Sequence, residues 1–128
     1  MQMKNEINTD KAPKAIGPYS QAIKTGDLLF ISGQIPIDPT TASLVEGSFK
    51  DKVKQVFKNL ENICIAGGTK LNNAVKLNIF LTDLSKFSQV NEVMESIFTK
   101  PYPARATIEI SALPLDVEVE IDAVVVSE

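Results

Sequence analysis

The residues best suited to chemistry lie near the C-terminus, in the stretch PARATIEISALPLDVEVEIDA (103–123). Arg105 is the only arginine of the chain, and acidic and apolar residues alternate in the second half of the stretch. At the period of a β-strand, this alternation places Glu118, Glu120 and Asp122 on one face. An arginine binds a carboxylate through two parallel hydrogen bonds, and crowded acids raise the pKa of a glutamate towards the range useful for proton transfer. The pattern indicates a site for a small carboxylic acid.

The strand around Arg105 has the same two-sided character. Arg105, Thr107 and Glu109 share one face, and the residues between them are apolar or small. One interpretation is that both polar faces are simply solvated, as most charged strand faces are. The sharper hypothesis is that the arginine and a carboxylate face a shared pocket.

Composition limits the kinds of protein that this chain can be. Its 128 residues suit a single domain (1–128), and 44% hydrophobic with 23% charged residues is typical of a globular protein without a membrane span. The formal net charge of −3 gives no general attraction for phosphate backbones, so nucleic acid is not the expected partner. The polar N-terminal stretch lacks the apolar core of a signal peptide, and we expect a cytoplasmic location.

The absence of histidine narrows the chemistry further. It removes the commonest metal ligand and every triad that uses imidazole as its base. Cys64 is the only cysteine and lies on the apolar side of a predicted helix, where we expect an inert core thiol. Acid–base chemistry is left to carboxylates, lysine, tyrosine or water, and no metal site is expected.

Periodicity predicts the elements that must position these groups. Strands are expected over 19–25, 28–36, 75–81, 105–110 and 117–126, and helices over 48–67 and 87–98. Gly26-Asp27 indicates a hairpin turn, and Ser48 with Asp51 indicates a capping box at the first helix. The order β-β-α-β-α-β-β predicts an α+β fold whose two helices cover one face of the sheet, leaving the other to water or another subunit. Taken alone, the pattern pairs the last two strands as a hairpin.

Three further residues have both a structural and a functional interpretation. Tyr19, in IGPY, is more often a half-buried packing residue than a catalytic one. Gly33, in SGQ, is more often a bulge or strand-end glycine than a ligand contact. Asn91 lies at the border of the apolar stripe of the second helix, where a boundary side chain is the plainer interpretation.

Four segments together resemble a known family. They are AIGPYSQA (15–22), LFISGQIPIDP (29–39), FLTDLSKFSQVNEVM (80–94) and PARATIEISALPLDVEVEIDAVVV (103–126). Their glycine-proline-tyrosine, serine-glycine-glutamine and proline-alanine-arginine elements are similar, in order, to those of the reactive intermediate deaminase (Rid, YjgF-like) family. The resemblance implies a chorismate-mutase-like mixed sheet with strand 74–82 between the last two strands. It also implies a homotrimer that packs the uncovered sheet faces inside.

The same resemblance implies a function. Family sites lie in clefts between subunits and hydrolyse 2-imino acids, reached from 2-enamino acids, to 2-keto acids and ammonia without a cofactor or metal. By motif, Arg105 would hold the substrate carboxylate and Glu120 would handle protons for the attacking water. The substrate-binding set would be Tyr19, Gly33, Asn91, Arg105 and Thr107. The implied enzyme is a 2-iminobutanoate/2-iminopropanoate deaminase that removes reactive intermediates released by pyridoxal-phosphate enzymes.

A second class of function stays open at this point. Members of the family have also been described as translation inhibitors, ribonucleases and regulators, so an interaction protein without imine turnover is the alternative. A local basic patch from Lys50, Lys52, Lys54 and Lys58 would favour RNA binding. The lack of histidine and the negative net charge are unfavourable to it.

Overall fold

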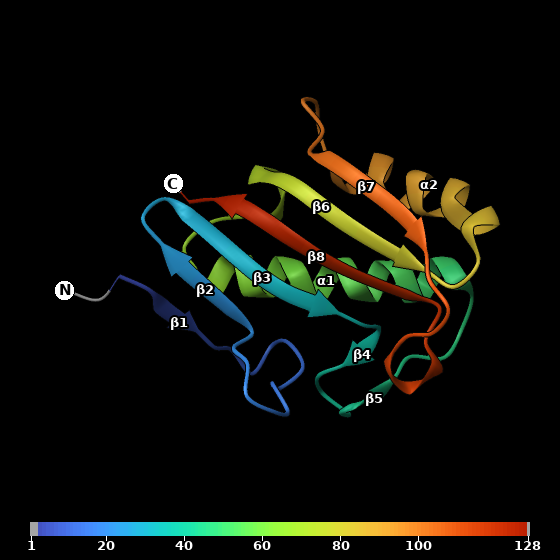
Figure 1. The fold of residues 1–128 in the computed structure, drawn as a ribbon, viewed down its shortest axis with the longest axis horizontal. Coiled ribbons are helices and arrows are strands. Elements are labelled where there is room, and N and C mark those ends of the chain that lie inside the picture. Colours follow the sequence, from blue (N-terminus) through green and yellow to red (C-terminus); the bar gives the residue numbers. More distant parts are fainter. Residues whose placement is uncertain (1–2, 128) are drawn as a thin grey trace.

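A computed structural model describes residues 3–127 and shows an α+β fold (Figure 1). The strands are β1 (Asn5–Ile7), β2 (Ala22–Thr25), β3 (Leu28–Gln34), β4 (Ile37–Asp38), β5 (Ser43–Leu44), β6 (Ala74–Leu81), β7 (Ala104–Glu109) and β8 (Val119–Val126). The helices are α1 (Phe49–Ala66) and α2 (Phe87–Ile97), with short 3₁₀ turns η1 (Leu71–Asn73), η2 (Leu84–Lys86) and η3 (Pro114–Asp116). Figure 1 shows both α-helices on the same side of the main sheet, as predicted.

The main sheet has the strand order β1-β2-β3-β8-β6-β7. Ile79 of β6 lies opposite Thr107 of β7 in a parallel pair and opposite Ile121 of β8 in an antiparallel pair. The hairpin that the bare pattern favoured for the last two strands is therefore wrong, and the order implied by the family resemblance is confirmed. The physical reason is the crossover through α2, which returns the chain parallel to β6 and places β7 at the edge.

Capping and turn residues set the ends of several predicted elements. Ser48 and Asp51 exchange the two hydrogen bonds of a capping box, each 3.1 Å long, and α1 begins with the next residue after Ser48. Gly67 ends α1, with its N–H donating to the carbonyl of Ile63 at 3.0 Å. Gly26, at φ 55°, allows the tight turn between β2 and β3.

The hydrophobic core lies between the helices and one face of the sheet. The side chains of Leu60, Ile63, Leu77 and Ile121 are fully buried there. Cys64 is also fully buried, and burial raises the pKa of its thiol to about 12. This agrees with the inert core thiol that we expected, because a thiol with that pKa is not ionised at neutral pH.

The opposite face of the sheet is open and partly apolar. Phe30 of β3 and Ile108 of β7 keep 44% and 48% of their surface exposed. Leu28 lies opposite Val126, and both are also exposed large apolar residues. No element within residues 3–127 covers this face. None of the helices in that range is long and apolar enough to cross a bilayer.

Several boundaries differ from the sequence pattern. β2 begins at Ala22 and not at residue 19, which leaves Tyr19 in the preceding loop. β8 begins at Val119, so Glu118 precedes the strand. The short strands β1, β4 and β5 were not predicted, because two or three residues are too few to show a period.

Candidate functional site

Glu120 lies in the larger of two cavities that contain predicted site residues. This cavity has a volume of about 490 Å³. Its lining residues are Pro13, Lys14, Ile16, Tyr19, Gln21, Ser32, Gly33, Gln34, Ile35, Ile37, Pro114, Leu115 and Glu120. Three of the six predicted residues, Tyr19, Gly33 and Glu120, thus meet in one cavity. They come from the loop before β2, from β3 and from β8.

Gly33 is needed for a close approach to Glu120. A Cβ built on Gly33 would lie 2.6 Å from Oε2 and 2.8 Å from Cδ of the Glu120 side chain. The register between β3 and β8 also shifts between Ile31 and Gln34, as in a β-bulge. The bulge interpretation of Gly33 therefore applies. Gly33 also lines the cavity, where its missing side chain lets the Glu120 carboxylate lie over the strand.

The surroundings of Glu120 favour its protonated form more than water does. Burial, and secondly the nearby charge of Asp122, raise the pKa of the Glu120 carboxyl above its ordinary value. No hydrogen bond or ion pair to this carboxylate is formed within residues 3–127, whereas Asp122 accepts one from Asn78 at 2.8 Å. A carboxyl with a raised pKa and unused hydrogen-bonding capacity is suited to proton transfer near neutral pH.

Glu118 has a different environment from its neighbours in the acidic row. Its carboxylate binds Lys86 of η2 and, at 3.3 Å, Lys52 of α1. The hydrogen bond from Lys86, and after it the one from Lys52, lower the pKa of Glu118. The three acids that strand parity places on one face therefore differ in their surroundings: Glu118 is paired with lysines of α1 and η2 at the end of the sheet, and Glu120 and Asp122 lie on the open face.

Arg105 occupies a second, smaller cavity of about 210 Å³. That cavity is lined by Asn91, Met94, Glu95, Tyr102, Pro103 and Arg105. The Nη1 group of Arg105 donates to Oδ1 of Asn91 and lies 3.5 Å from the sulfur of Met94. The boundary position predicted for Asn91 thus brings its amide to the guanidinium. Only one of the two terminal nitrogens is engaged in these contacts, so the outer edge of the fork keeps donors for a ligand.

Within one chain, Arg105 and Glu120 lie on opposite faces of the sheet. Arg105 is in register with the fully buried Leu77, on the helix side, whereas Glu120 is in register with Phe80 on the open side. Residues in register point to the same face. A pocket shared by these two residues within a single chain, the sharper hypothesis from the sequence, is therefore not formed.

Thr107 lies two residues from Arg105 on the same face but lines neither cavity. Its hydroxyl oxygen is buried and has no hydrogen-bond partner among residues 3–127. A buried hydroxyl without a partner is uncommon in folded proteins, and a water or ligand would remove the cost. The hydroxyl of Thr107 is therefore available to a water or ligand.

Two residues near Glu120 were missed by the sequence reasoning. Gln21 is 2% exposed and holds the N-terminal loop: its amide donates to the carbonyl of Pro13 at 2.8 Å and accepts from the N–H of Thr9 at 2.8 Å. Leu115 lines the cavity with a backbone φ of 55°, which is unfavourable for a leucine. A glutamine in a run of polar residues gives no signal of burial, and nothing in the sequence predicts a left-handed leucine.

Comparisons with known proteins cover nearly the whole chain. A protein-family profile described as Endoribonuclease L-PSP matches residues 9–127. The 2-iminobutanoate/2-iminopropanoate deaminase of Dermatophagoides farinae is 40% identical over 128 residues, which is 100% of both chains. Several relatives with higher identity carry only the general name RutC family protein.

Solved structures agree in fold. RidA from the Antarctic bacterium Psychrobacter sp. is 49% identical, with a TM-score of 0.92 over 95% of this chain and 98% of its own. TdcF of Escherichia coli with bound serine is 35% identical, with a TM-score of 0.90 over 97% of this chain and 99% of its own. The profile match and these identities show that the chain belongs to the reactive intermediate deaminase (Rid, YjgF-like) family.

Proposed function

We propose that this protein hydrolyses 2-imino acids such as 2-iminopropanoate and 2-iminobutanoate to 2-keto acids and ammonia. The observation that carries the proposal is the Glu120 carboxyl, with its raised pKa and no bonding partner in residues 3–127, placed over Gly33 in a 490 Å³ cavity. The deaminase relative from Dermatophagoides farinae supports the reaction.

Arg105 supplies the anchor for the substrate carboxylate. Its guanidinium is held by Asn91 in a small cavity, and its free edge matches the geometry of a carboxylate. The solved relative that holds serine binds a small molecule of the same kind, with a carboxylate next to a carbon that bears nitrogen. Arg105 thus supports a substrate that carries a carboxylate, and Glu120 supports a reaction that proceeds by proton transfer.

The proposed reaction needs only water and proton transfers. The water oxygen adds to the carbon of the C=N bond while the Glu120 carboxylate takes a proton from it and passes one to the imine nitrogen. Glu120 then takes the hydroxyl proton of the resulting carbinolamine and delivers a proton to its amino nitrogen, so that the C–N bond breaks, ammonia departs and the C=O bond of the keto acid forms. Glu120 begins and ends the cycle in the same protonation state, as a general acid–base must.

The two halves of the site are proposed to come from different copies of the chain. Arg105 and Glu120 face away from one another across one sheet, but the edge strand β7 and the open apolar face are both free to meet a second copy. Because the two halves differ, they join head to tail, and such contacts close into a ring. We propose the homotrimer implied by the resemblance, so sedimentation equilibrium should give three times the chain mass of 14.0 kDa.

The direct test is keto-acid release from freshly generated 2-iminopropanoate. Glu120→Gln keeps the shape of the side chain but removes the ionisable group, and turnover should fall by about a hundredfold or more. Glu118→Gln is the matched control, since its carboxylate binds lysines outside the cavity, and its turnover should stay near that of the parent. Equal loss, or equal retention, in the two variants would contradict the proposal.

The alternative function in RNA binding receives less support. Of the four lysines in the predicted basic patch, Lys50 pairs with Glu92 and Lys52 pairs with Glu118. Two of the four charges are thus balanced locally, and the chain as a whole carries a net charge of −3. We therefore propose no nucleic-acid function.

A further inference from the structure

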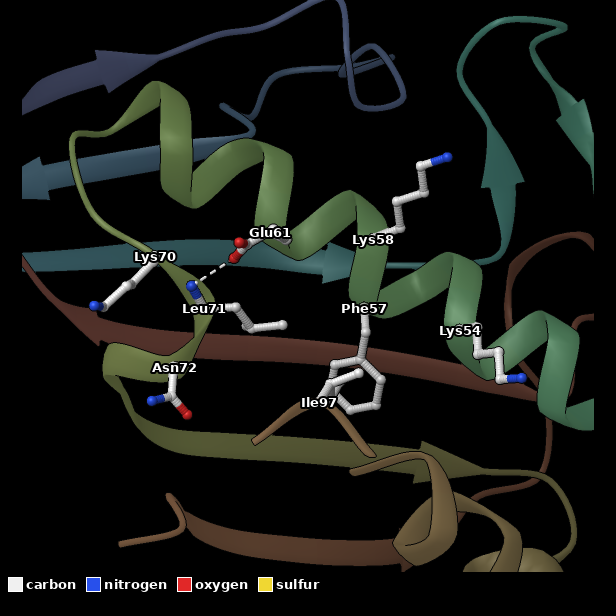
Figure 2. A pocket seen from close by; sticks show the side chains of 8 residues that line it. All are labelled: Lys54, Phe57, Lys58, Glu61, Lys70, Leu71, Asn72 and Ile97. Atoms are coloured by element: carbon white, nitrogen blue, oxygen red, sulfur yellow. Dashed lines mark hydrogen bonds between the residues drawn. The ribbon is translucent and has the colours of Figure 1, made fainter. Parts of the chain in front are cut away.

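A third cavity lies on the helix side of the molecule and shares no residue with either half of the candidate site (Figure 2). Its volume is about 340 Å³, within the usual range for a small-molecule site. It is lined by Lys54, Phe57, Lys58 and Glu61 of α1, by Lys70, Leu71 and Asn72 at the turn before β6, and by Ile97 at the end of α2.

The floor of this cavity is apolar. Figure 2 shows the ring of Phe57 and the side chains of Leu71 and Ile97 close together between the two helices and the turn. Ile97 is 41% exposed, whereas Phe57 and Leu71 are 2% and 7% exposed, so the apolar surface in contact with water is mainly that of Ile97. An apolar ring placed here would remove that surface from water, which is favourable at roughly 25 cal/mol per Å² of apolar area.

Most of the polar groups that could compete with a ligand are already occupied. The carboxylate of Glu61 accepts from the N–H of Leu71 at 2.6 Å, shown as the dashed line in Figure 2. The amide of Asn72 donates to the Thr99 hydroxyl at 2.8 Å and accepts from the Thr99 N–H at 2.9 Å. Lys54 and Lys58 at the rim are therefore the groups that can select the charge of a ligand.

The charge at the rim is positive in a protein whose net charge is negative. The residues that line the cavity include three lysines, Lys54, Lys58 and Lys70, and one carboxylate, Glu61. The charges of Lys54 and Lys58 also act on the nearby carboxylates of Asp51 and Asp38. Within residues 3–127, neither Lys54 nor Lys58 forms a salt bridge or hydrogen bond. Figure 2 shows the Lys58 ammonium group directed away from the Phe57 ring and the Lys54 ammonium group directed along α1, and the flexible four-carbon stem of lysine allows both to turn towards a bound anion.

We infer that this cavity binds a small amphipathic anion, namely a flat aromatic carboxylate whose ring lies on Phe57, Leu71 and Ile97 and whose carboxylate meets Lys54 and Lys58. Complementary charge at the rim and an apolar floor fit this class. The inference does not rest on the proposed function, because none of these residues belongs to the candidate site.

The test uses 2-naphthoate and its uncharged analogue 2-naphthamide as probes of the full-length protein. Titration calorimetry should show 2-naphthoate binding roughly tenfold more tightly, because two ammonium groups act on the carboxylate. Amide NMR shifts in the unmodified protein should concentrate at Lys58, Leu71 and Ile97. Equal affinity for both probes, or shifts concentrated at Gly33 and Glu120, would overturn the inference without bearing on the deaminase proposal.

Variants test the rim and the floor separately. Reversing both charges, with Lys54→Glu and Lys58→Glu, should weaken 2-naphthoate binding by roughly tenfold or more and leave 2-naphthamide binding nearly unchanged. The matched control, Lys4→Glu with Lys11→Glu, changes the net charge equally at exposed positions that do not line the cavity and should keep the parent affinity. An equal effect of the two pairs would contradict a local site. If the charge-reversed chain does not fold, the NMR result on the unmodified protein decides.

Discussion

Replacing Gly33 with alanine should reduce turnover without reducing stability. The new Cβ would lie 2.6 Å from Oε2 of Glu120, and real Cβ contacts are essentially never below 3.0 Å, so the carboxylate must move by at least 0.4 Å. A misplacement of 1 Å costs about a hundredfold in rate, so a shift of this size should cost roughly tenfold. The measurement is kcat/KM for keto-acid release from 2-iminopropanoate.

Stability should respond in the opposite way. Gly33 does not have a left-handed backbone, and the atom in the way is the far end of a flexible side chain. Gly→Ala changes at compatible positions stabilise by about 0.4–1 kcal/mol through the unfolded chain. The melting temperature of Gly33→Ala should therefore equal or exceed that of the parent.

Gly26→Ala is the matched control for this experiment. Gly26 has φ 55° and no atom within 4 Å of its built Cβ, so alanine there is strained but touches nothing. This variant should lose about 1 kcal/mol of stability and keep full turnover. Combining Gly33→Ala with Glu120→Gln should add no further loss, because both changes act on one carboxylate. Full turnover by Gly33→Ala alone would refute the placement of Glu120 in catalysis.

Three further predictions concern the groups around the site. Glu118→Gln should lower the free energy of unfolding by about 1 kcal/mol, because its partly exposed ion pairs with Lys52 and Lys86 are lost. The melting temperature should drop by a few degrees, and no drop would show that these pairs contribute nothing. The pKa of Glu120 is raised in the folded protein, so the protonated carboxyl stabilises the fold at low pH, and this stabilisation is lost as the pH rises through that pKa. Glu120→Gln should therefore have a melting temperature no lower than that of the parent at pH 7. The kcat/KM of the parent should fall as the pH drops through the same pKa, because the carboxylate becomes protonated. Gln21→Leu should cost about 2 kcal/mol in denaturant unfolding, since it leaves the backbone groups of the N-terminal loop without their buried partner, and an unchanged midpoint would contradict that function.

The fold was predictable from the sequence wherever a period or a cap was strong. The helix that begins after Ser48 and the hairpin at Gly26 follow from side-chain chemistry that acts within four residues. Strand pairing was not predictable in this way, because alternation along β7 and β8 says which residues share a face but not which strand lies next to which. The family resemblance supplied that order, and the structure confirmed it.

The alternation of side chains in the strands of the candidate site was predictable, but the arrangement of those strands was not. The alternation around Arg105 and that around Glu120 were each correct, but parity within a strand does not say which face of the sheet is turned to the helices. Glu118 differs from Glu120 and Asp122 because its carboxylate pairs with Lys52 and Lys86, which come from distant elements. Nothing in the sequence around Glu118 predicts these tertiary contacts. The contact between Gly33 and Glu120 likewise needs coordinates, since 87 positions separate the two residues in the sequence.

We propose that Arg105 of one copy and Glu120 of another complete a deaminase site, and mixing two inactive variants can distinguish this from a site within one chain. Arg105→Ala and Glu120→Gln should each be inactive alone. When equal amounts are unfolded and refolded together, about a quarter of the head-to-tail contacts should pair an intact Arg105 with an intact Glu120. The mixture should therefore recover about a quarter of the parent's activity on 2-iminopropanoate. If the mixture stays inactive while forming the same assembly as the parent, a site shared between copies is contradicted.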